Sequence, residues 1–271
     1  MHKKFFHYIF ILIFVFSIIV IIFSINNFIN RKNDKFVITA DGIEIAINQY
    51  QRGHKDVLIV APGWFMCKNS KPFVNMAKDF SNHFDVIVMN FRGHCESSGK
   101  FTFTSREYND LNAVINYAKS KYKKVYVAGF SLGSATAIIT QYKFHNADKL
   151  ILVSPPVDFD KIENQFWKKE AFIPTLQKFE LKTWTGIVPG KIWLNKIKPI
   201  DIIAQIPDTP MLFIAGEKDP TINIWHTIEL YNNANQPKKL VIFEKSIHAE
   251  DIYLANNKRF IDVCIKWLKD N

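Results

Sequence analysis

Short apolar runs alternate along this chain with longer amphipathic stretches. This alternation is typical of a parallel sheet whose strands are connected by helices. Asp41 and Gly42 suit a two-residue hairpin turn between the first two runs. The apolar runs predict strands at residues 36–40, 43–49, 56–61, 85–90, 124–128, 149–153, 211–215 and 239–243. The amphipathic stretches predict helices at residues 70–81, 106–121, 132–144, 222–233 and 252–269. The pattern therefore predicts an α/β fold with a mostly parallel eight-stranded sheet flanked by helices.

The N-terminal segment has a different pattern, because it carries no charged residue from Phe5 to Ile25 and is rich in Ile and Phe. About twenty apolar residues are enough for a helix that spans a bilayer. The run is longer than the apolar core of a typical cleaved signal peptide, and no small-x-small cleavage site follows it. We therefore expect residues 1–35 to be an uncleaved transmembrane anchor with a short linker, rather than a removed signal, ahead of one domain at 36–271.

Charges on the two sides of this run do not orient it. Lys3, Lys4 and the terminal amine on one side balance the basic residues on the other. The basic head followed by an apolar run is the usual layout of an exported protein. We therefore expect a single-pass membrane protein whose domain at 36–271 lies on the extracytoplasmic side.

A sharp turn from strand to helix is predicted at Gly129-Phe130-Ser131-Leu132-Gly133. Glycines two positions on either side of a serine let the backbone bend tightly and let neighbouring elements approach closely. Such a turn would expose the hydroxyl of Ser131. The pentapeptide alone also fits a tight turn with an incidental serine, so its interpretation depends on partner residues elsewhere.

Two partner residues follow the last two predicted strands, Asp219 after the first of them and His248 after the second. Both would lie at the carboxyl edge of the sheet. A serine hydroxyl becomes an effective nucleophile when an imidazole takes its proton, and an aspartate fixes the tautomer of that imidazole. The sequence thus predicts a triad of Ser131, Asp219 and His248, in the chain order of α/β-hydrolases and without a metal or organic cofactor.

On these residues the chain resembles the α/β-hydrolase family from about Phe36 to its C-terminus. It is most similar to the branch of serine aminopeptidase-like and monoglyceride-lipase-like enzymes. A further matching segment is Asn90-Phe91-Arg92-Gly93-His94-Cys95-Glu96-Ser97-Ser98-Gly99, which is similar to the loop after the fourth strand of these enzymes. Asn90 and Cys95 stand where Asp and Gly are usual. We interpret both departures as drift within a structural turn.

The resemblance also implies an oxyanion hole formed by the backbone amides of Leu132 and Trp64. Family members commonly carry His-Gly after the third strand, whereas this chain has Ala61-Pro62-Gly63-Trp64. The glycine is retained and the histidine is not. Because the donors are backbone N–H groups, the turn itself is the property that the chemistry needs.

Other ionisable residues compete for these roles, since the chain contains 8 histidines and 25 acidic residues. Asp158 is the best alternative to Asp219, because some hydrolases place the orienting carboxylate after the sixth strand. Asp110 is expected to be a structural hydrogen-bonding residue, and His94 to bond within its own loop. His226 is expected to be a surface or packing residue.

Residues 155–206 interrupt the alternation between the sixth and seventh strands, and we interpret them as a small helical lid. Its aromatic residues either line an apolar acyl pocket or form the core of the lid itself. Its lysines either face anionic lipid headgroups or simply face water. The aromatic residues are Trp167, Trp184, Trp193, Phe159, Phe166, Phe172 and Phe179.

The net charge of +10 would often suggest a nucleic-acid partner. The lysines are scattered and no recognition motif accompanies them, so we expect no nucleic acid and prefer a basic surface near an anionic membrane or a lysine-rich composition alone. Cys67, Cys95 and Cys264 are odd in number and lack metal-ligand spacing, which supports neither a disulfide framework nor a zinc site.

These features predict a membrane-anchored serine hydrolase, similar to carboxylesterases and lipases, that cleaves an ester or related acyl bond of a small-molecule or lipid-like substrate. The first alternative is a serine aminopeptidase, in which Glu163 or Glu170 of the lid binds the free amine of the substrate. The second is a binding protein without activity, which Asn90, Cys95 and the missing histidine before Gly63 keep open. The oligomeric state is left open.

Overall fold

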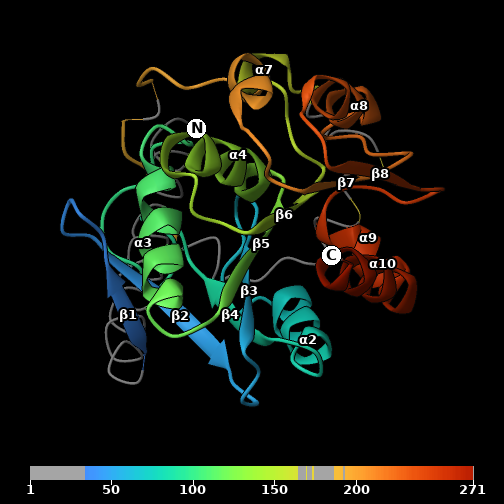
Figure 1. Cartoon of the computed structure of the whole chain (residues 1–271). Helices are drawn as coiled ribbons and strands as arrows, with labels where there is room; N and C mark the ends of the chain where they lie inside the picture. Colours follow the sequence, from blue (N-terminus) through green and yellow to red (C-terminus); the bar gives the residue numbers. More distant parts are fainter. Residues whose placement is uncertain (1–33, 164–168, 170–172, 174–185, 192, 271) are drawn as a thin grey trace, which may run out of the picture.

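The computed structural model describes residues 34–163, 169, 173, 186–191 and 193–270, which form one eight-stranded sheet with helices on both faces (Figure 1). The strand order is β1-β2-β4-β3-β5-β6-β7-β8. β1 and β2 are antiparallel to their neighbours, and the remaining pairs are parallel. The strands are β1 (Lys35–Ile38), β2 (Glu44–Tyr50), β3 (Asp56–Ala61), β4 (Asp85–Met89), β5 (Lys124–Phe130), β6 (Lys149–Val153), β7 (Met211–Gly216) and β8 (Lys238–Phe243). The predicted α/β sheet is confirmed.

The central strands are buried on both faces, as parallel strands between two helical layers must be. Every residue of β4 and β7 is buried, and so are Val57–Ala61 of β3. This burial explains why these strands read as continuous apolar runs rather than as alternating ones. The parallel pairing of β3 to β8 brings their carboxyl ends to one edge of the sheet, where the loops that carry Ser131, Asp219 and His248 emerge.

Helices cover the sheet in two groups (Figure 1). One face packs against α3 (Glu107–Lys119), α4 (Leu132–Phe144), α7 (Pro199–Ile202) and α8 (Ile224–Asn233). The other face packs against α2 (Lys71–Phe80), α9 (Glu250–Ala255) and α10 (Asn257–Lys269). α4 is the most deeply placed, because its residues from Leu132 to Gln141 are all buried. Because α4 is fixed in the core, the residue before it, Ser131, also has a fixed position.

Two local predictions were wrong. The first connection is not a two-residue turn at Asp41-Gly42, because the Thr39 amide donates to the Ile43 carbonyl and β2 begins only at Glu44. The predicted helix 252–269 is divided into two helices, α9, which begins at Glu250, and α10, which begins at Asn257. Asn256 leaves the helical conformation, with φ −141°, and its side-chain amide donates to Ser246 Oγ at 2.9 Å.

The described parts of the inserted segment hold two short 3-10 helices, η2 (Phe159–Lys161) and η3 (Ile203–Gln205), besides α7. Residues 186–190 run beside the loop after β4, with one isolated bridge between His94 and Ile187 and another between Phe101 and Pro189. Trp193 is largely exposed. Trp167, Trp184, Phe166, Phe172, Phe179 and Glu170 lie outside the described residues, so their predicted roles stay predictions.

The predicted anchor at Phe5 to Ile25 also lies outside the described residues. Within the residues that the structure describes, no helix has the length and apolarity needed to cross a bilayer.

Candidate active site

Ser131 lies on a strained turn between β5 and α4. Its backbone φ is +51°, in the left-handed region that residues with a side chain rarely adopt. The turn is held by its neighbours: the Ser131 amide donates to the Val153 carbonyl at 2.8 Å, and the Ser131 carbonyl accepts from the Ser134 amide at 2.9 Å. Strain of this kind persists only where the surroundings impose it, and it is common at functional sites.

The two glycines around Ser131 are needed for close approach. A Cβ atom on Gly133 would lie 2.1 Å from the Ala61 carbonyl oxygen, and one on Gly129 would lie 2.5 Å from the Gly133 oxygen. No side chain fits at these distances, so the glycines let β3, β5 and the start of α4 pack directly against one another. This packing fixes Ser131 at the carboxyl edge of the sheet.

Asp219 and His248 are brought together by the loops after β7 and β8. The Nδ1 atom of His248 lies 2.7 Å from Oδ2 of Asp219. The other carboxylate oxygen of Asp219 accepts hydrogen bonds from the amides of Thr221 and Ile222, each at 2.9 Å. The aspartate side chain is buried, whereas 18% of the histidine side chain is exposed. A fixed carboxylate therefore orients an imidazole that solvent and small molecules can still reach.

Hydrogen bonds across the end of β6 connect the loop of His248 to the turn of Ser131. The Ala249 amide donates to Ser154 Oγ at 3.1 Å. Ser154 directly follows Val153, whose carbonyl accepts from the Ser131 amide. Ser154 and Ala249 both have positive φ, +47° in each case. The chain next to His248 is thus tied over β6 toward Ser131.

The loop from Pro62 to Ser70, between β3 and α2, carries Trp64, the predicted oxyanion donor, and is called the oxyanion loop after that prediction. Its Gly63 lies against the turn of Ser131, because a Cβ atom on Gly63 would be 3.4 Å from Ser131 Cβ. The next residue is Trp64, and the residue after Ser131 is Leu132. Within the described residues neither the Trp64 amide nor the Leu132 amide donates a hydrogen bond. Both are available to a developing negative charge near Ser131.

The competing residues have other partners. Asp158 Oδ2 pairs with Lys198 Nζ at 2.6 Å. Asp110 pairs with Arg92 and is completely buried, in agreement with its predicted structural role. His226 is buried as well: its Nδ1 accepts from the Val157 amide at 3.2 Å, and its Nε2 lies 3.1 Å from Glu163.

His94 bonds within its own loop, as predicted. Its Nδ1 donates to the Arg92 carbonyl at 3.1 Å. Within the described residues its Nε2 has no hydrogen-bond partner, and the ring meets Phe101 edge-on at 4.7 Å between ring centres. Complete burial lowers the pKa of His94 from its ordinary 6.5 to about 4, because the imidazolium loses its hydration. His94 is therefore a neutral structural residue near neutral pH.

A disulfide joins Cys67 of the oxyanion loop to Cys95, with Cα atoms 6.4 Å apart. The expectation that the cysteines support no disulfide framework was therefore wrong for this pair, and of the three cysteines Cys264 is free, buried in α10. The bond could not be predicted from the odd number of cysteines or from their spacing, because neither says which cysteines lie close together in the fold. The usable signal was topological, since both cysteines follow the adjacent parallel strands β3 and β4.

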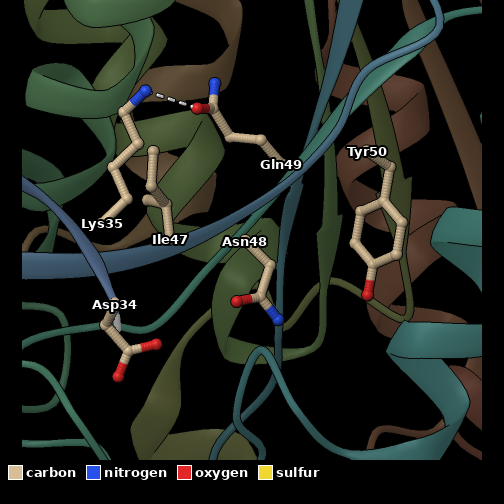
Figure 2. A pocket seen from close by; sticks show the side chains of 6 residues that line it. All are labelled: Asp34, Lys35, Ile47, Asn48, Gln49 and Tyr50. Atoms are coloured by element: carbon tan, nitrogen blue, oxygen red, sulfur yellow. Dashed lines mark hydrogen bonds between the residues drawn. The ribbon is translucent and has the colours of Figure 1, made fainter. Parts of the chain in front are cut away.

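A shallow cavity of about 370 Å³ lies along β2 (Figure 2). It is lined by Asp34, Lys35 and Ile47 to Tyr50, and Lys35 Nζ donates to Gln49 Oε1 at 2.6 Å (Figure 2). The cavity extends from Asp34 and Asn48, which contact Lys68, to Tyr50, which pairs with Val86 near the start of β4. Within the described part of the chain, no group of three or more His, Cys, Asp or Glu residues is arranged to hold a metal ion.

Comparison with known proteins agrees with this geometry. A family model described as "alpha/beta hydrolase fold" matches residues 56–169. The chain has the α/β-hydrolase fold. The resemblance to the α/β-hydrolase superfamily that the sequence indicated is thereby confirmed. An uncharacterized protein of Bacillus subtilis, YqkD, is 27% identical over 187 residues, which cover 67% of this chain and 60% of YqkD.

Solved structures with this fold include two esterases. An esterase from Pyrococcus furiosus superposes with a TM-score of 0.72 and 20% identity, over 88% of this chain and 89% of that one. An esterase from Exiguobacterium antarcticum superposes with a TM-score of 0.68 and 19% identity, over 87% of this chain and 99% of that one. At these identities the likeness establishes the fold alone.

Proposed function

We propose that this protein is a serine hydrolase that cleaves an ester or a related acyl bond. The observation that carries the proposal is the His248–Asp219 contact at 2.7 Å, at the same edge of the sheet as the strained turn of Ser131. The solved structures with this fold include the esterases of Pyrococcus furiosus and Exiguobacterium antarcticum. The fold supports many chemistries, so the proposal rests on the site rather than on the fold.

The proposed reaction has two acyl transfers. Ser131 Oγ attacks the acyl carbonyl carbon while His248 Nε2 takes the hydroxyl proton, and the Asp219 carboxylate stabilises the imidazolium that forms. The amides of Leu132 and Trp64 donate to the oxyanion of the tetrahedral intermediate. His248 then gives its proton to the departing alkoxide, which leaves an acyl-Ser131 ester. Water, deprotonated by His248, releases the acid and restores the serine.

An aminopeptidase is less favoured by the contacts of Glu163. Its carboxylate accepts from Trp225 Nε1 at 2.7 Å and from the Asn223 amide at 3.3 Å, and it lies 3.1 Å from His226 Nε2. These contacts tie the start of the inserted segment to α8. A carboxylate engaged in this way is a poor receptor for a substrate amine, so the proposal places esters before aminoacyl amides.

Labelling with a fluorophosphonate tests the nucleophile. The detergent-solubilised full-length protein is expected to gain one phosphonyl group, seen by intact mass, and Ser131→Ala to gain none. Ser120→Ala is the matched control, because Ser120 is exposed at the end of α3 and its hydroxyl contacts only the Tyr117 carbonyl among the described residues. Labelling of Ser131→Ala equal to wild type would refute the assignment.

The type of acyl donor is tested by rates. The turnover rates of short-chain esters, long-chain esters and aminoacyl amides are compared on a protein preparation that reacts with the fluorophosphonate. Faster turnover of the esters supports the proposal, and faster turnover of the amides supports the peptidase. A protein that folds but neither labels nor turns over any of them would be a binding protein.

We also propose that the hydrolase domain is held by the N-terminal segment on the extracytoplasmic side of a membrane. The Cys67–Cys95 disulfide supports this side, because structural disulfides persist in oxidising compartments and are rare in the cytoplasm. Protease added to spheroplasts that express the full chain is expected to digest the domain. Complete protection until the membrane is lysed would place the domain inside.

A further inference from the structure

The oxyanion loop is held by an unusual set of contacts around Cys67 and Lys68. Lys68 is completely buried, and its Nζ lies 2.7 Å from Asp34 Oδ1, 3.1 Å from Asn48 Oδ1 and 3.6 Å from Glu96 Oε2. A buried ammonium group is stable only when several oxygen atoms surround it. The position of the loop is therefore coupled to the carboxylates that meet this lysine.

Asn90 closes this arrangement. Its Oδ1 accepts from the Lys68 amide at 2.6 Å, and its Nδ2 donates to Glu96 Oε2 at 2.9 Å. An aspartate at this position would accept from the amide but would set a second carboxylate against Glu96. The asparagine that departs from the family pattern is thus the residue type that this contact requires, and it is not drift.

Cys95 departs from the family pattern for a related reason. Its φ is +50°, in the left-handed region where glycine is favoured, and the disulfide holds it there. The Cys95 amide donates to the Gly186 carbonyl at 2.7 Å, on the returning limb of the inserted segment. The disulfide thus joins the oxyanion loop to the loop after β4, and the hydrogen bond of the Cys95 amide connects that loop to the insertion.

We propose that the Cys67–Cys95 disulfide, together with the Lys68–Asn90–Glu96 group, positions the oxyanion loop for catalysis, so that turnover depends on the disulfide being closed. This inference rests on the proposed hydrolase function. Cys67 lies only three residues after Trp64. The segment from Gly63 to Cys67 also has an internal hydrogen bond, because the Met66 amide donates to the Gly63 carbonyl at 3.3 Å. Opening the disulfide frees this segment on the side of the Trp64 amide. The oxyanion is formed only in the transition state, so kcat falls and KM changes little.

The first test opens the bond in the detergent-solubilised full-length protein. A dithiol attacks one sulfur of the disulfide and expels the other as a thiolate. The second thiol of the reagent then completes the exchange, leaving two cysteine thiols and one oxidised reagent. We expect kcat for an ester to fall at least about tenfold with KM unchanged, since losing one oxyanion donor costs about 10²–10³-fold. Removal of the dithiol and reoxidation restore kcat.

Two variants control this test. The double variant Cys67→Ser/Cys95→Ser is expected to have the low kcat of the reduced enzyme and to ignore the dithiol. Cys264→Ala is expected to respond as wild type does, because its buried thiol is not part of the bond. Alkylation and intact mass verify how many thiols are free. An unchanged kcat in enzyme whose disulfide is verified to be open would overturn the proposal.

The second test keeps the disulfide and changes the polar group. Asn90→Asp sets two carboxylates together and is expected to lower kcat. Adding Glu96→Gln exchanges the donor and acceptor while keeping one carboxylate and one amide, so the double variant is expected to regain kcat. A merely destabilising effect would add in the double variant rather than reverse.

The failure of this inference is distinct from the failure of the proposed function. If wild type hydrolyses esters and Ser131→Ala does not, the function stands whatever the dithiol does. If wild type hydrolyses esters and the open disulfide leaves kcat unchanged, the positioning role alone is refuted.

Discussion

His248 and Asp219 come from loops after neighbouring parallel strands, and their side chains meet at 2.7 Å between Nδ1 and Oδ2. The amides of Thr221 and Ile222 hold the other oxygen of Asp219. The position of the carboxylate is thus fixed before any substrate binds. The carboxylate accepts a hydrogen bond from Nδ1 of His248 and so favours the tautomer with a proton on Nδ1. In the proposed reaction the opposite nitrogen, Nε2, exchanges protons with Ser131.

The first prediction concerns this contact. In Asp219→Asn the side chain no longer stabilises the imidazolium, so kcat/KM for an ester is expected to fall about 10³–10⁴-fold. Thermal stability should change much less than activity. The matched control is Asp158→Asn, because Asp158 follows the neighbouring strand but pairs with Lys198. Equal losses in the two variants would contradict the assignment of Asp219.

The second prediction concerns pH and His94. The pKa of His94 is about 4 in the folded protein, below its ordinary value of 6.5. The unfolded chain therefore binds a proton at a higher pH than the folded chain does, and stability falls as pH decreases from about 6.5 to about 4. The full loss from this residue is about 3 kcal/mol. Urea denaturation at a series of pH values measures it.

The variant His94→Gln isolates this contribution, because His226 also has a pKa lowered by burial and acts in the same direction. The variant is expected to be less stable at neutral pH but to depend less steeply on pH between 6.5 and 4. A slope identical to that of wild type would mean that His94 does not stay neutral in the fold.

The third prediction concerns the glycine that follows Ser131 by two positions. Gly133→Ala would place a Cβ atom 2.1 Å from the backbone oxygen of Ala61, and the overlap involves backbone that cannot rotate away. We expect a loss of about 3 kcal/mol in the free energy of unfolding, together with loss of labelling at Ser131. Chemical denaturation and fluorophosphonate labelling measure the two effects.

Gly42→Ala is the control for that variant. Gly42 has φ +79°, but a Cβ atom there would meet nothing within 4 Å. Only conformational strain remains, which costs about 1 kcal/mol. If Gly133→Ala were no more destabilising than Gly42→Ala, the close approach at the turn of Ser131 would not be a constraint.

The sequence was sufficient for the sheet because parallel strands buried on both faces leave an unmistakable apolar run, as in Val57–Ala61. The turn at Ser131 was predictable too, because a tight turn between a strand and a helix requires glycines at these two nearby positions. The division of the last helix at Asn256 was not, because it depends on a contact with Ser246 in another loop. The helix propensity of a segment does not indicate which residues elsewhere in the chain will contact it.

The group around Lys68 was missed for the same reason. A lysine in a loop is normally solvated, and its burial here depends on Asp34, Asn48 and Glu96, which lie 34, 20 and 28 positions away in the chain. Asn90 and Cys95 were noticed as departures, yet each is explained only by its spatial partner. A departure from a family pattern is thus better treated as a question about contacts than as drift.

The last prediction concerns Arg92, which stands between two carboxylates of different burial. Asp110 is fully buried and bonds the Arg92 amide at 2.9 Å and Nε at 2.8 Å, whereas 37% of the Asp41 side chain is exposed. Asp110→Asn removes the buried carboxylate of the pair and leaves the guanidinium with Asp41 alone, so we expect a loss of about 3–5 kcal/mol. Asp41→Asn changes a screened pair near the surface and is expected to cost less than about 1 kcal/mol.

Urea denaturation of both variants, followed by fluorophosphonate labelling under native conditions, separates stability from activity. Asp110 lies in α3 and makes no contact with the triad among the described residues, so folded Asp110→Asn should still label at Ser131. Equal destabilisation by the two variants would mean that burial does not set the strength of these pairs. Loss of labelling in folded Asp110→Asn would instead mean that Arg92 controls the loop after β4, and through Cys95 the oxyanion loop, more directly than its contacts indicate.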